Sequence, residues 1–326
     1  MLTERILTAF PSTSSDSLPQ ICDALFRQQQ SSWPQLIDGY ASLKEVRVRE
    51  VMCEGYSVFV QFNPQRIVSS GAKVDPKSIN ERKCFLCVEN LPADEKGVLY
   101  RDEFLILCNP WPILDRHLTI AHTKHVPQGI EGFVSAFLDL AQAMSPDFSV
   151  FYNGPKCGAS APDHRHFQAA PLGLLPIERD AAHPTRRELR FTDAGTVLLS
   201  LKNVGRQVIV IEGTGAADVE SLFSRLLSSM RQVLRLEEEP KVNLLCVHQN
   251  ETYRVIVFPR RKHRPDSFFR TDDKQILISP AATDVGGILV TPREKDFDRL
   301  DANTIQGIFD EVMLDEDTVE QIIETL

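Results

Sequence analysis

Hydrophobic positions repeat at two different periods along the chain, and the periods predict an alternation of helices and strands. Residues 17–43 carry apolar side chains at helical spacing, so the first 45 residues are expected to be helical. Alternating apolar and polar positions then predict a hairpin over residues 46–62 that turns at Glu54-Gly55. A sheet is therefore expected to begin where the N-terminal helices end.

The same patterns recur further along the chain. Helices are expected over residues 130–144 and 216–236, and short helices after Asp296. Residues 63–83 are expected to form a polar loop. The expected strands are 98–109, 117–121, 148–152, 196–202, 206–212, 242–248 and 253–259.

The order of strand, helix and strand pair appears twice, which predicts two related units. The expected fold is α+β, with helices packed on antiparallel sheets. We place the first unit at residues 1–175, including the N-terminal helices, and the second at residues 176–326. We expect the two units to pack together as one body.

The overall charge narrows the class of ligand. The 326 residues carry a formal net charge of −9, and 42% of them are hydrophobic, as in ordinary globular proteins. A protein that binds nucleic acid needs concentrated positive charge, so we expect no nucleic-acid partner. A nucleotide needs only a local basic pocket, so the net charge does not exclude a nucleotide as ligand.

Compartment is indicated by the apolar runs and the cysteines. No apolar run approaches the length needed to cross a bilayer, and the N-terminal residues do not resemble a signal peptide. The seven cysteines are scattered and odd in number, which is typical of a reducing compartment. We expect a cytoplasmic protein that does not bind a membrane.

A loop of small residues followed by alternating polar side chains is the most informative segment. Residues 153–163 contain Gly154, Gly158 and Ser160, and the chain continues as His-Arg-His-Phe-Gln at 164–168. In a strand, His164, His166 and Gln168 would share one face, beside a loop whose amides can face an anion. This arrangement suits attack by an imidazole on phosphorus, although paired histidines in a strand can also be purely structural.

Within this segment, His166 is the expected nucleophile. An imidazole that attacks phosphorus must be neutral and oriented through its far nitrogen, and a metal-bound His164 could not attack. Donors are needed around the non-bridging oxygens of the transferred group. The expected donors are Gln168, Ser160, the backbone amides of Gly158 and Ala159, and Lys156, whose alternative is a solvated side chain.

The pair Cys84 and Cys87 has the spacing of a zinc site. Two thiolates at this spacing can share a tetrahedral zinc ion, and histidines would complete the ligand set. His125 and His164 are the best candidates, with His122 as a rival to His125. Such a zinc ion would be structural and need not touch substrate. The alternative is a redox dithiol.

Two further groups of polar residues stand out. His117 begins the expected strand 117–121 and could meet the wall formed by residues 164–168, although a structural role is the alternative. Residues 260–264 are Arg-Arg-Lys-His-Arg in an otherwise acidic chain, so Arg260 and Lys262 could bind substrate phosphates. The alternative for these cations is a solvated or salt-bridged surface.

Residues 153–168 resemble the active-site motif of the transferase branch of the histidine-triad superfamily. That branch includes galactose-1-phosphate uridylyltransferases, diadenosine tetraphosphate phosphorylases (ATP adenylyltransferases) and GDP-hexose phosphorylases. The form Gly-Ala-Ser-x-x-x-His-x-His-x-Gln looks closest to the two phosphorylase groups. Cys84-Phe-Leu-Cys87 resembles the zinc-binding pair of the uridylyltransferases, and residues 278–290 resemble a C-terminal segment of the phosphorylases.

The resemblance implies roles for particular residues. His166 would carry the nucleotidyl group, and Gln168 would stand where the hydrolase branch has a third histidine. Ser160 and Asn153 would lie at the phosphate and in its loop, Asn109 near the ribose and Phe104 near the base. The implied zinc ligands are Cys84, Cys87, His125 and His164.

The resemblance also implies a fold and an activity. Two histidine-triad-like halves would surround a shared antiparallel sheet, and only the first would carry the catalytic motif. The activity would be nucleotidyl transfer from a nucleoside diphosphate sugar or a dinucleoside polyphosphate to a phosphate-bearing acceptor. A hydrolase of the same superfamily and a non-catalytic, zinc-stabilised nucleotide-binding protein are the alternatives. A homodimer is compatible with the resemblance, since dimers are common among such enzymes.

Overall fold

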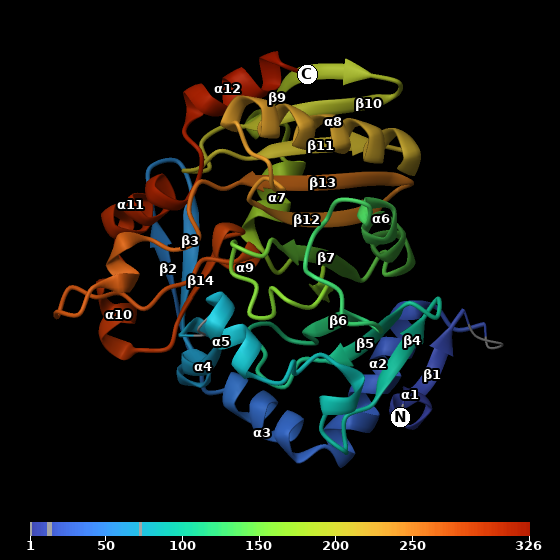
Figure 1. Ribbon diagram of the computed structural model, residues 1–326. Helices are drawn as coiled ribbons and strands as arrows, with labels where there is room; N and C mark the ends of the chain where they lie inside the picture. The colour runs from blue at the N-terminus through green and yellow to red at the C-terminus, as the bar shows by residue number, and fades with distance from the viewer. Residues whose placement is uncertain (1, 12–14, 72–73) are drawn as a thin grey trace.

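The computed structural model describes residues 2–11, 15–71 and 74–326. Its dominant feature is a long mixed sheet crossed on both faces by helices (Figure 1). The N-terminus lies near one end of this sheet and the C-terminus near the other (Figure 1). Within the described residues, no helix combines the length and the apolar character that a membrane span requires.

The N-terminal part contains short helices as well as strands. Its helices are α1 (Leu2–Arg5), α2 (Leu18–Ser32), α3 (Pro34–Leu43), α4 (Ile67–Ser70), α5 (Pro76–Glu81) and α6 (Val134–Ala143). Its strands are β1 (Ile6–Phe10), β2 (Arg47–Met52), β3 (Ser57–Phe62), β4 (Gly97–Tyr100), β5 (Phe104–Cys108), β6 (Leu118–His122), β7 (Phe148–Asn153) and β8 (His166–Pro171).

The C-terminal part repeats the mixture. Its strands are β9 (Arg187–Asp193), β10 (Thr196–Leu201), β11 (Ile209–Gly213), β12 (Val242–Gln249), β13 (Thr252–Pro259) and β14 (Ile288–Thr291). Its helices are α7 (Pro176–Ala182), α8 (Ala216–Leu234), α9 (Ala282–Val285), α10 (Glu294–Arg299), α11 (Ala302–Val312) and α12 (Glu316–Glu324). Short 3₁₀ turns lie at Pro64–Arg66, Val88–Asn90, Pro184–Arg186 and Asp266–Phe269.

Among the described residues, eleven strands form one sheet whose order is nearly symmetric about its centre. The order is β1-β4-β5-β6-β8-β7-β12-β13-β11-β10-β9. β4 to β8 and β9 to β13 therefore occupy matching places, and α6 and α8 follow the third strand of each set. We call these the first half and the second half. They join where Asn243 on β12 pairs with Asn153 on β7, and the α+β expectation of two halves around a shared antiparallel sheet is confirmed.

One face of the sheet is buried beneath helices along its whole length. Apolar side chains of α2, α6, α8 and α12 pack there against alternate residues of the strands. Phe167 on β8 and Val257 on β13 are both fully buried in this cluster. Continuous burial of apolar area here is what holds the two halves together as one core.

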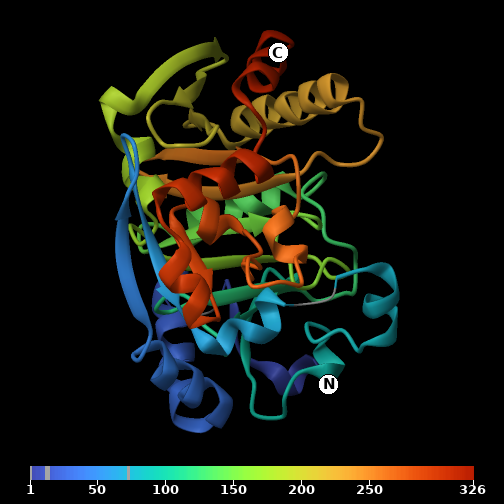
Figure 2. The same cartoon turned by 90° about the vertical axis from the view of Figure 1, so that its left-hand side faces the viewer.

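The opposite face is covered differently over the two halves. Over the second half, α7, α9, α11 and a small sheet of order β14-β3-β2 enclose a second apolar core. The hairpin β2–β3 runs beside the long sheet and reaches both halves (Figure 2). Gln61 Nε2 donates to the carbonyl of Ile113 in one half, and Arg186 Nη2 donates to that of Gly55 from the other.

Several local expectations need correction. Residues 6–10 form strand β1, which pairs parallel with β4, so the first 45 residues are not wholly helical. The expected strand 98–109 is the hairpin β4–β5, because Arg101 and Asp102 take positive φ angles and reverse the chain. Residues 63–83 contain short helices and not only a loop. β9, β14, α7 and α9 had no expected counterpart.

Candidate active site

The candidate site lies on the open face of the first half. His166 pairs with Ala121 and Gln168 with Thr119, so these side chains share a face of β6 and β8. The row of Gln168 and Thr119 continues through Leu107 on β5 to Gly97 on β4. Alternation along the strands therefore carries both polar side chains to the side that the helices leave free.

Hydrogen bonds fix the His166 imidazole in one tautomer. Its Nδ1 lies 2.8 Å from the carbonyl oxygen of His164, and since a carbonyl only accepts, Nδ1 carries the proton. Gln128 Oε1 accepts the His166 backbone N–H at 3.0 Å. Burial lowers the pKa of His166 to about 4, so the ring is neutral at neutral pH. No described residue bonds its Nε2, which keeps a lone pair for attack.

His117 orients the amide of Gln168. The Ile113 N–H donates to His117 Nδ1, so the proton lies on Nε2, which donates to Gln168 Oε1 at 2.8 Å. Burial also lowers the pKa of His117 to about 4, which favours this neutral tautomer. The Gln168 amide nitrogen is left to donate into the site. The expectation that a histidine at the start of this strand meets the wall is confirmed.

The small-residue loop between β7 and β8 is held by the second half. Asn153 Oδ1 accepts from Asn243 Nδ2 and from the Ala282 N–H, both at 2.7 Å. Gly158 has φ +88°, and a Cβ there would approach the Ala281 Cβ to 2.7 Å. Only glycine therefore fits at position 158. We call the hydrogen bonds through which Asn153 fastens the loop to the second half the bracket.

Arg260 is a structural member of this bracket, which corrects the expectation that it binds substrate. The side chain is 1% exposed, and its donors reach Asn243 Oδ1 together with four carbonyl oxygens. Because Asn243 Oδ1 accepts from Arg260, its Nδ2 is turned toward Asn153 and the carbonyl of Cys157. The buried guanidinium thus orients the loop from behind.

The open face contains a cavity of about 670 Å³. His166, Gln168, Ser160 and Asn109 line it, as the sequence predicts. A smaller cavity adjoins it and is lined by Asn153 and Gly158 as well as by Ser160 and Gln168. Ala159 lies buried between these loop residues. Seven expected site residues are thus brought to one place or next to it.

Two arginines that sequence reasoning missed supply the positive charge. Arg66 and Arg82 line the large cavity, and Arg66 lines the small one too. Burial lowers the pKa of Arg66 only to about 10, so it stays charged. Arg82 bonds Asp163 and the Ser160 carbonyl, while its Nη1 is buried without a partner among the described residues. Both come from the segment expected to be a plain polar loop, and no motif marked them.

Three other expected substrate contacts do not reach the cavity. Phe104 is 1% exposed and packs against Phe167 on the helix-covered face, since alternation turns Leu105 and Leu107 to the site instead. Lys156 forms an exposed ion pair with Glu238. Lys262 pairs with Asp266 and Glu311 at the surface, as the salt-bridged alternative requires.

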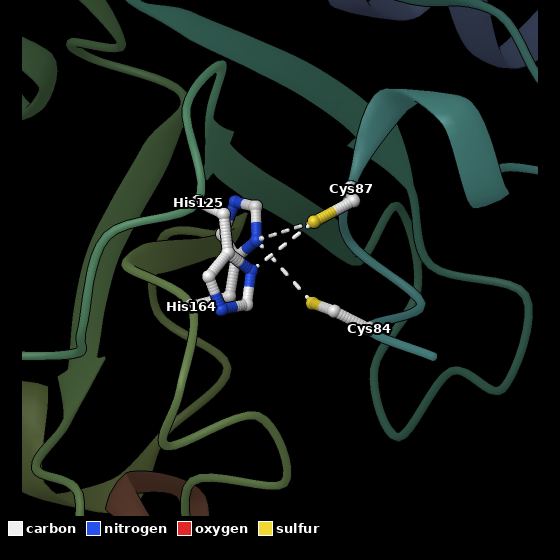
Figure 3. Close-up of side chains that lie close together, drawn as sticks. All are labelled: Cys84, Cys87, His125 and His164. Atoms are coloured by element: carbon white, nitrogen blue, oxygen red, sulfur yellow. Dashed lines mark hydrogen bonds between the residues drawn. The ribbon is translucent and has the colours of Figure 1, made fainter. Parts of the chain in front are cut away.

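Cys84, Cys87, His125 and His164 converge on one point beside the site, as Figure 3 shows. Cys84 Sγ lies 3.3 Å and Cys87 Sγ 3.6 Å from His164 Nδ1, and Cys87 Sγ lies 3.1 Å from His125 Nδ1. Ligands of one tetrahedral zinc ion stand ~3.5 Å apart. The four side chains can therefore hold a metal ion.

Neighbouring groups prepare these side chains for a cation. His164 Nε2 lies 2.8 Å from the His122 carbonyl, so Nε2 carries the proton and the Nδ1 lone pair faces the sulfurs. Burial raises the pKa of the Cys84 and Cys87 thiols, so thiolates here need a bound cation. His122 itself accepts from the Lys124 N–H and lies outside the cluster, which favours His125 over its rival.

His164 lies just before β8 and points to the Cys₂His₂ cluster, so only His166 and Gln168 share the strand face that the sequence predicts for all three residues. This site in one half of a nearly symmetric sheet fits what the resemblance to the transferase branch of the histidine-triad superfamily implies. Residues 181–326 match the family model described as "GDPGP1-like, C-terminal domain". Residues 25–171 match a domain of unknown function, DUF4922. A search of curated protein sequences finds no match.

Solved structures show the same fold. The yeast Ap4A phosphorylase Apa2 in complex with Ap4A is 15% identical, with a TM-score of 0.58, and the alignment covers 91% of this chain and 97% of that one. Its complex with AMP is 16% identical, with a TM-score of 0.54 and coverage of 89% and 96%. Together with the GDPGP1-like match, this fold confirms the resemblance to the transferase branch.

Proposed function

We propose that the protein is a nucleotidyltransferase or nucleotide phosphorylase that works through a covalent adduct on His166. The observation that carries the proposal is a neutral imidazole whose free Nε2 lies at a cavity beside Gln168, Ser160 and two arginines. The donor would be a nucleoside diphosphate sugar or a dinucleoside polyphosphate. The binding of Ap4A and AMP by the yeast phosphorylase of the same fold supports this ligand class.

In the first step, the His166 Nε2 lone pair forms a bond to the α-phosphorus. The bond from that phosphorus to the bridging oxygen breaks, and the oxygen leaves with the electron pair on a sugar phosphate or nucleotide. The imidazole becomes cationic, and the His164 carbonyl that accepts its Nδ1–H stabilises this charge. The Gln168 amide and the cations of Arg66 and Arg82 offset the negative charge on the transferred group.

In the second step, an oxygen of an acceptor phosphate attacks the same phosphorus from the vacated side. The acceptor would be orthophosphate, a sugar 1-phosphate or a nucleotide. The nitrogen–phosphorus bond breaks, its electron pair returns to Nε2, and His166 is again neutral. Asn109 is proposed to contact the ribose, and the 153–160 loop with Gly158, Ala159 and Ser160 the phosphate.

Gln168 favours transfer over hydrolysis. An amide held by His117 can donate a hydrogen bond but cannot take a proton from water. Adduct breakdown then depends on an acceptor that is already an anion. The non-catalytic alternative would show as nucleotide binding without any adduct.

We propose zinc as the metal of the Cys₂His₂ cluster, in a structural role. Cys84, Cys87, His125 and His164 would hold it, and the ion would supply charge that keeps both sulfurs as thiolates. His164 contributes its ring to this cluster and its carbonyl to His166. The cluster therefore positions the backbone that fixes the nucleophile.

The proposal is tested by intact-mass measurement after incubation with each donor. A mass gain of one nucleoside monophosphate, labile in acid, is expected in the wild-type protein and absent in His166→Asn. Full exchange activity in His166→Asn would contradict the proposal, as would a wild-type protein that binds donors and forms no adduct. The Lys156→Ala variant, altered at an exposed ion pair outside the cavity, should behave as wild type.

A further inference from the structure

One carboxyl group in the wall of the large cavity accepts no hydrogen bond from the described residues. Glu95 is 6% exposed and lines the cavity, and no described residue donates a hydrogen bond to its carboxylate. Each of the other buried carboxylates among the described residues has at least one partner: Glu178 accepts from the Gly173 and Leu175 N–H groups, Asp284 from that of Val290 and Asp296 from that of Leu277, while Asp180 pairs with Arg186. A buried polar group of this kind is costly unless a ligand completes it.

The burial of Glu95 raises its pKa to about 8, with a smaller opposing effect from the charge of Arg5. In the free protein this carboxyl is therefore largely protonated at neutral pH. A ligand with N–H donors would favour its ionised form. Such a ligand would supply the hydrogen bonds that the protein withholds.

The segment that presents Glu95 is firmly anchored, so the exposure of its carboxyl to the cavity is a built feature. Gln29 on α2 accepts the Lys96 N–H at 2.9 Å and donates to the Asp94 carbonyl at 3.1 Å. Arg5 donates to the carbonyls of Leu91, Pro92 and Ala93. These bonds fix residues 91–96 against α1 and α2, with the side chain of Glu95 at the cavity.

The sheet register places Glu95 at the far end of the cavity from the nucleophile. Gln168, Thr119, Leu107 and Gly97 lie in one row across four strands, which spans three strand spacings, or ~14 Å. Glu95 precedes that row by two residues at its outer end. A nucleotide with its α-phosphorus at the nucleophile would pass its ribose near the middle of this row, so its base would lie at the outer end.

The surroundings of this end suit a flat, partly apolar ring. Trp33, Leu91 and Leu107 are buried and line the cavity together with Glu95. An apolar wall with a single convergent acceptor binds a ring by contact and selects it through its N–H edge. Resting on the proposed function, we propose that Glu95 reads the nucleobase by accepting hydrogen bonds from its N–H groups.

The test is a cycle in which both the protein and the base lose their hydrogen-bonding group. Calorimetric titration compares AMP, GMP, CMP and UMP with purine riboside 5′-monophosphate, whose base has no N–H, on wild type, Glu95→Gln and Glu95→Leu. At least one natural monophosphate is expected to bind wild type about 10- to 100-fold more tightly than the purine riboside compound. This preference should fall to about threefold or less in Glu95→Leu, where the purine riboside compound binds as in wild type, and Glu95→Gln should change the ranking of the bases.

Glu178→Gln is the matched control, since Glu178 is 7% exposed and lies outside the cavity. It should keep the wild-type preference. An unchanged base preference in both Glu95 variants would overturn the inference. The inference would also be overturned if the affinity lost in these variants depended on the ribose 2′-hydroxyl and not on the base, as measured with the 2′-deoxy monophosphates. Adduct formation is assayed separately, so a base preference that depends on Glu95 without any adduct would refute only the proposed transfer.

Discussion

β8 and β13 occupy matching places in the two halves of the long sheet, yet the same face is used differently over them. On β8 this face carries His166 and Gln168 and borders a cavity. On β13 it carries Ile256 and Phe258, both fully buried under the small sheet and α11. One half thus leaves the face open and polar, and the other fills it with an apolar core.

On the proposed function, this difference gives the nucleophile to the first half and a supporting role to the second. Its apolar core packs against β12 and β13, and β12 presents Asn243 to the loop at Asn153. Arg260, at the end of β13, fixes which way the Asn243 amide points. A fold with two similar halves can therefore assign substrate contact to one and positioning to the other.

The largest expected effects come from one substitution on this face in each half, which should lower activity in one case and stability in the other. His166→Asn should abolish adduct formation, by at least ~10³-fold, with little change in the free energy of unfolding. Ile256→Ala should instead cost about 2–5 kcal/mol of stability, since it opens a cavity in a packed core. Denaturant unfolding and intact mass measure the two effects. A large stability loss in His166→Asn would show that the open face is also a structural core.

The bracket between the halves is tested by Asn243→Asp. An aspartate still accepts from Arg260 but cannot donate to Asn153 or to the Cys157 carbonyl. We expect the rate of adduct formation to fall about 10- to 100-fold, which is the loss of two buried hydrogen bonds to the loop.

The control for the bracket is Lys262→Ala, which removes the surface ion pairs with Asp266 and Glu311 two residues after Arg260. Adduct formation measured by rapid quench should be unchanged in this variant. Wild-type rates in Asn243→Asp would mean that the second half does not position the loop. A lower rate in Lys262→Ala would return that lysine to the site.

Metal removal tests a second support of the nucleophile, this time inside the first half. Metal analysis should find about one zinc ion per chain. Chelation should lower the adduct rate about 10- to 100-fold and reduce the melting temperature, because His164 links the cluster to His166. Added zinc should restore both. Protein purified without chelator and free of metal would contradict the zinc assignment, and a reversible Cys84–Cys87 disulfide would favour the redox alternative.

The smallest expected effect concerns the stability that the chain loses by burying the Glu95 carboxyl in the open face of the first half. The pKa of Glu95 is about 8 in the folded chain and ~4.3 when unfolded, so the unfolded state loses its proton first. The buried Glu95 carboxyl therefore hardly lowers the free energy of unfolding at pH 4, and it lowers this free energy increasingly as the pH rises from there to 8. Glu95→Gln should raise the melting temperature by a few degrees at pH 8 and hardly change it at pH 4. Equal shifts at both pH values would show that Glu95 ionises freely.

Two further expectations stay predictions. The division of the chain near residue 175 falls between the two family matches, which end at residue 171 and begin at residue 181. β3 of the N-terminal part nevertheless pairs with β14 of the C-terminal part, so the two units exchange segments. A homodimer, expected from the resemblance, would be measured by light scattering.

The sequence by itself determined the local chemistry of the site. Strand alternation places His166 and Gln168 on one face, and the Cys-x-x-Cys spacing brings Cys84 and Cys87 together as a pair of metal ligands. These features depend on short-range geometry, since a two-residue period or a fixed loop suffices to align them. The alternation that turns Leu107 toward the site and Phe104 away from it is local in the same way.

Only the tertiary structure decided which charges and carboxylates belong to the site. Arg260 lies in a basic run that looks solvated, yet long-range packing of β12 and α11 buries it. Arg66, Arg82 and Glu95 carry no motif, and they reach the cavity because segments distant in sequence fold over β5 and β8. Burial and partner choice arise from such long-range contacts, which no local pattern of residues encodes.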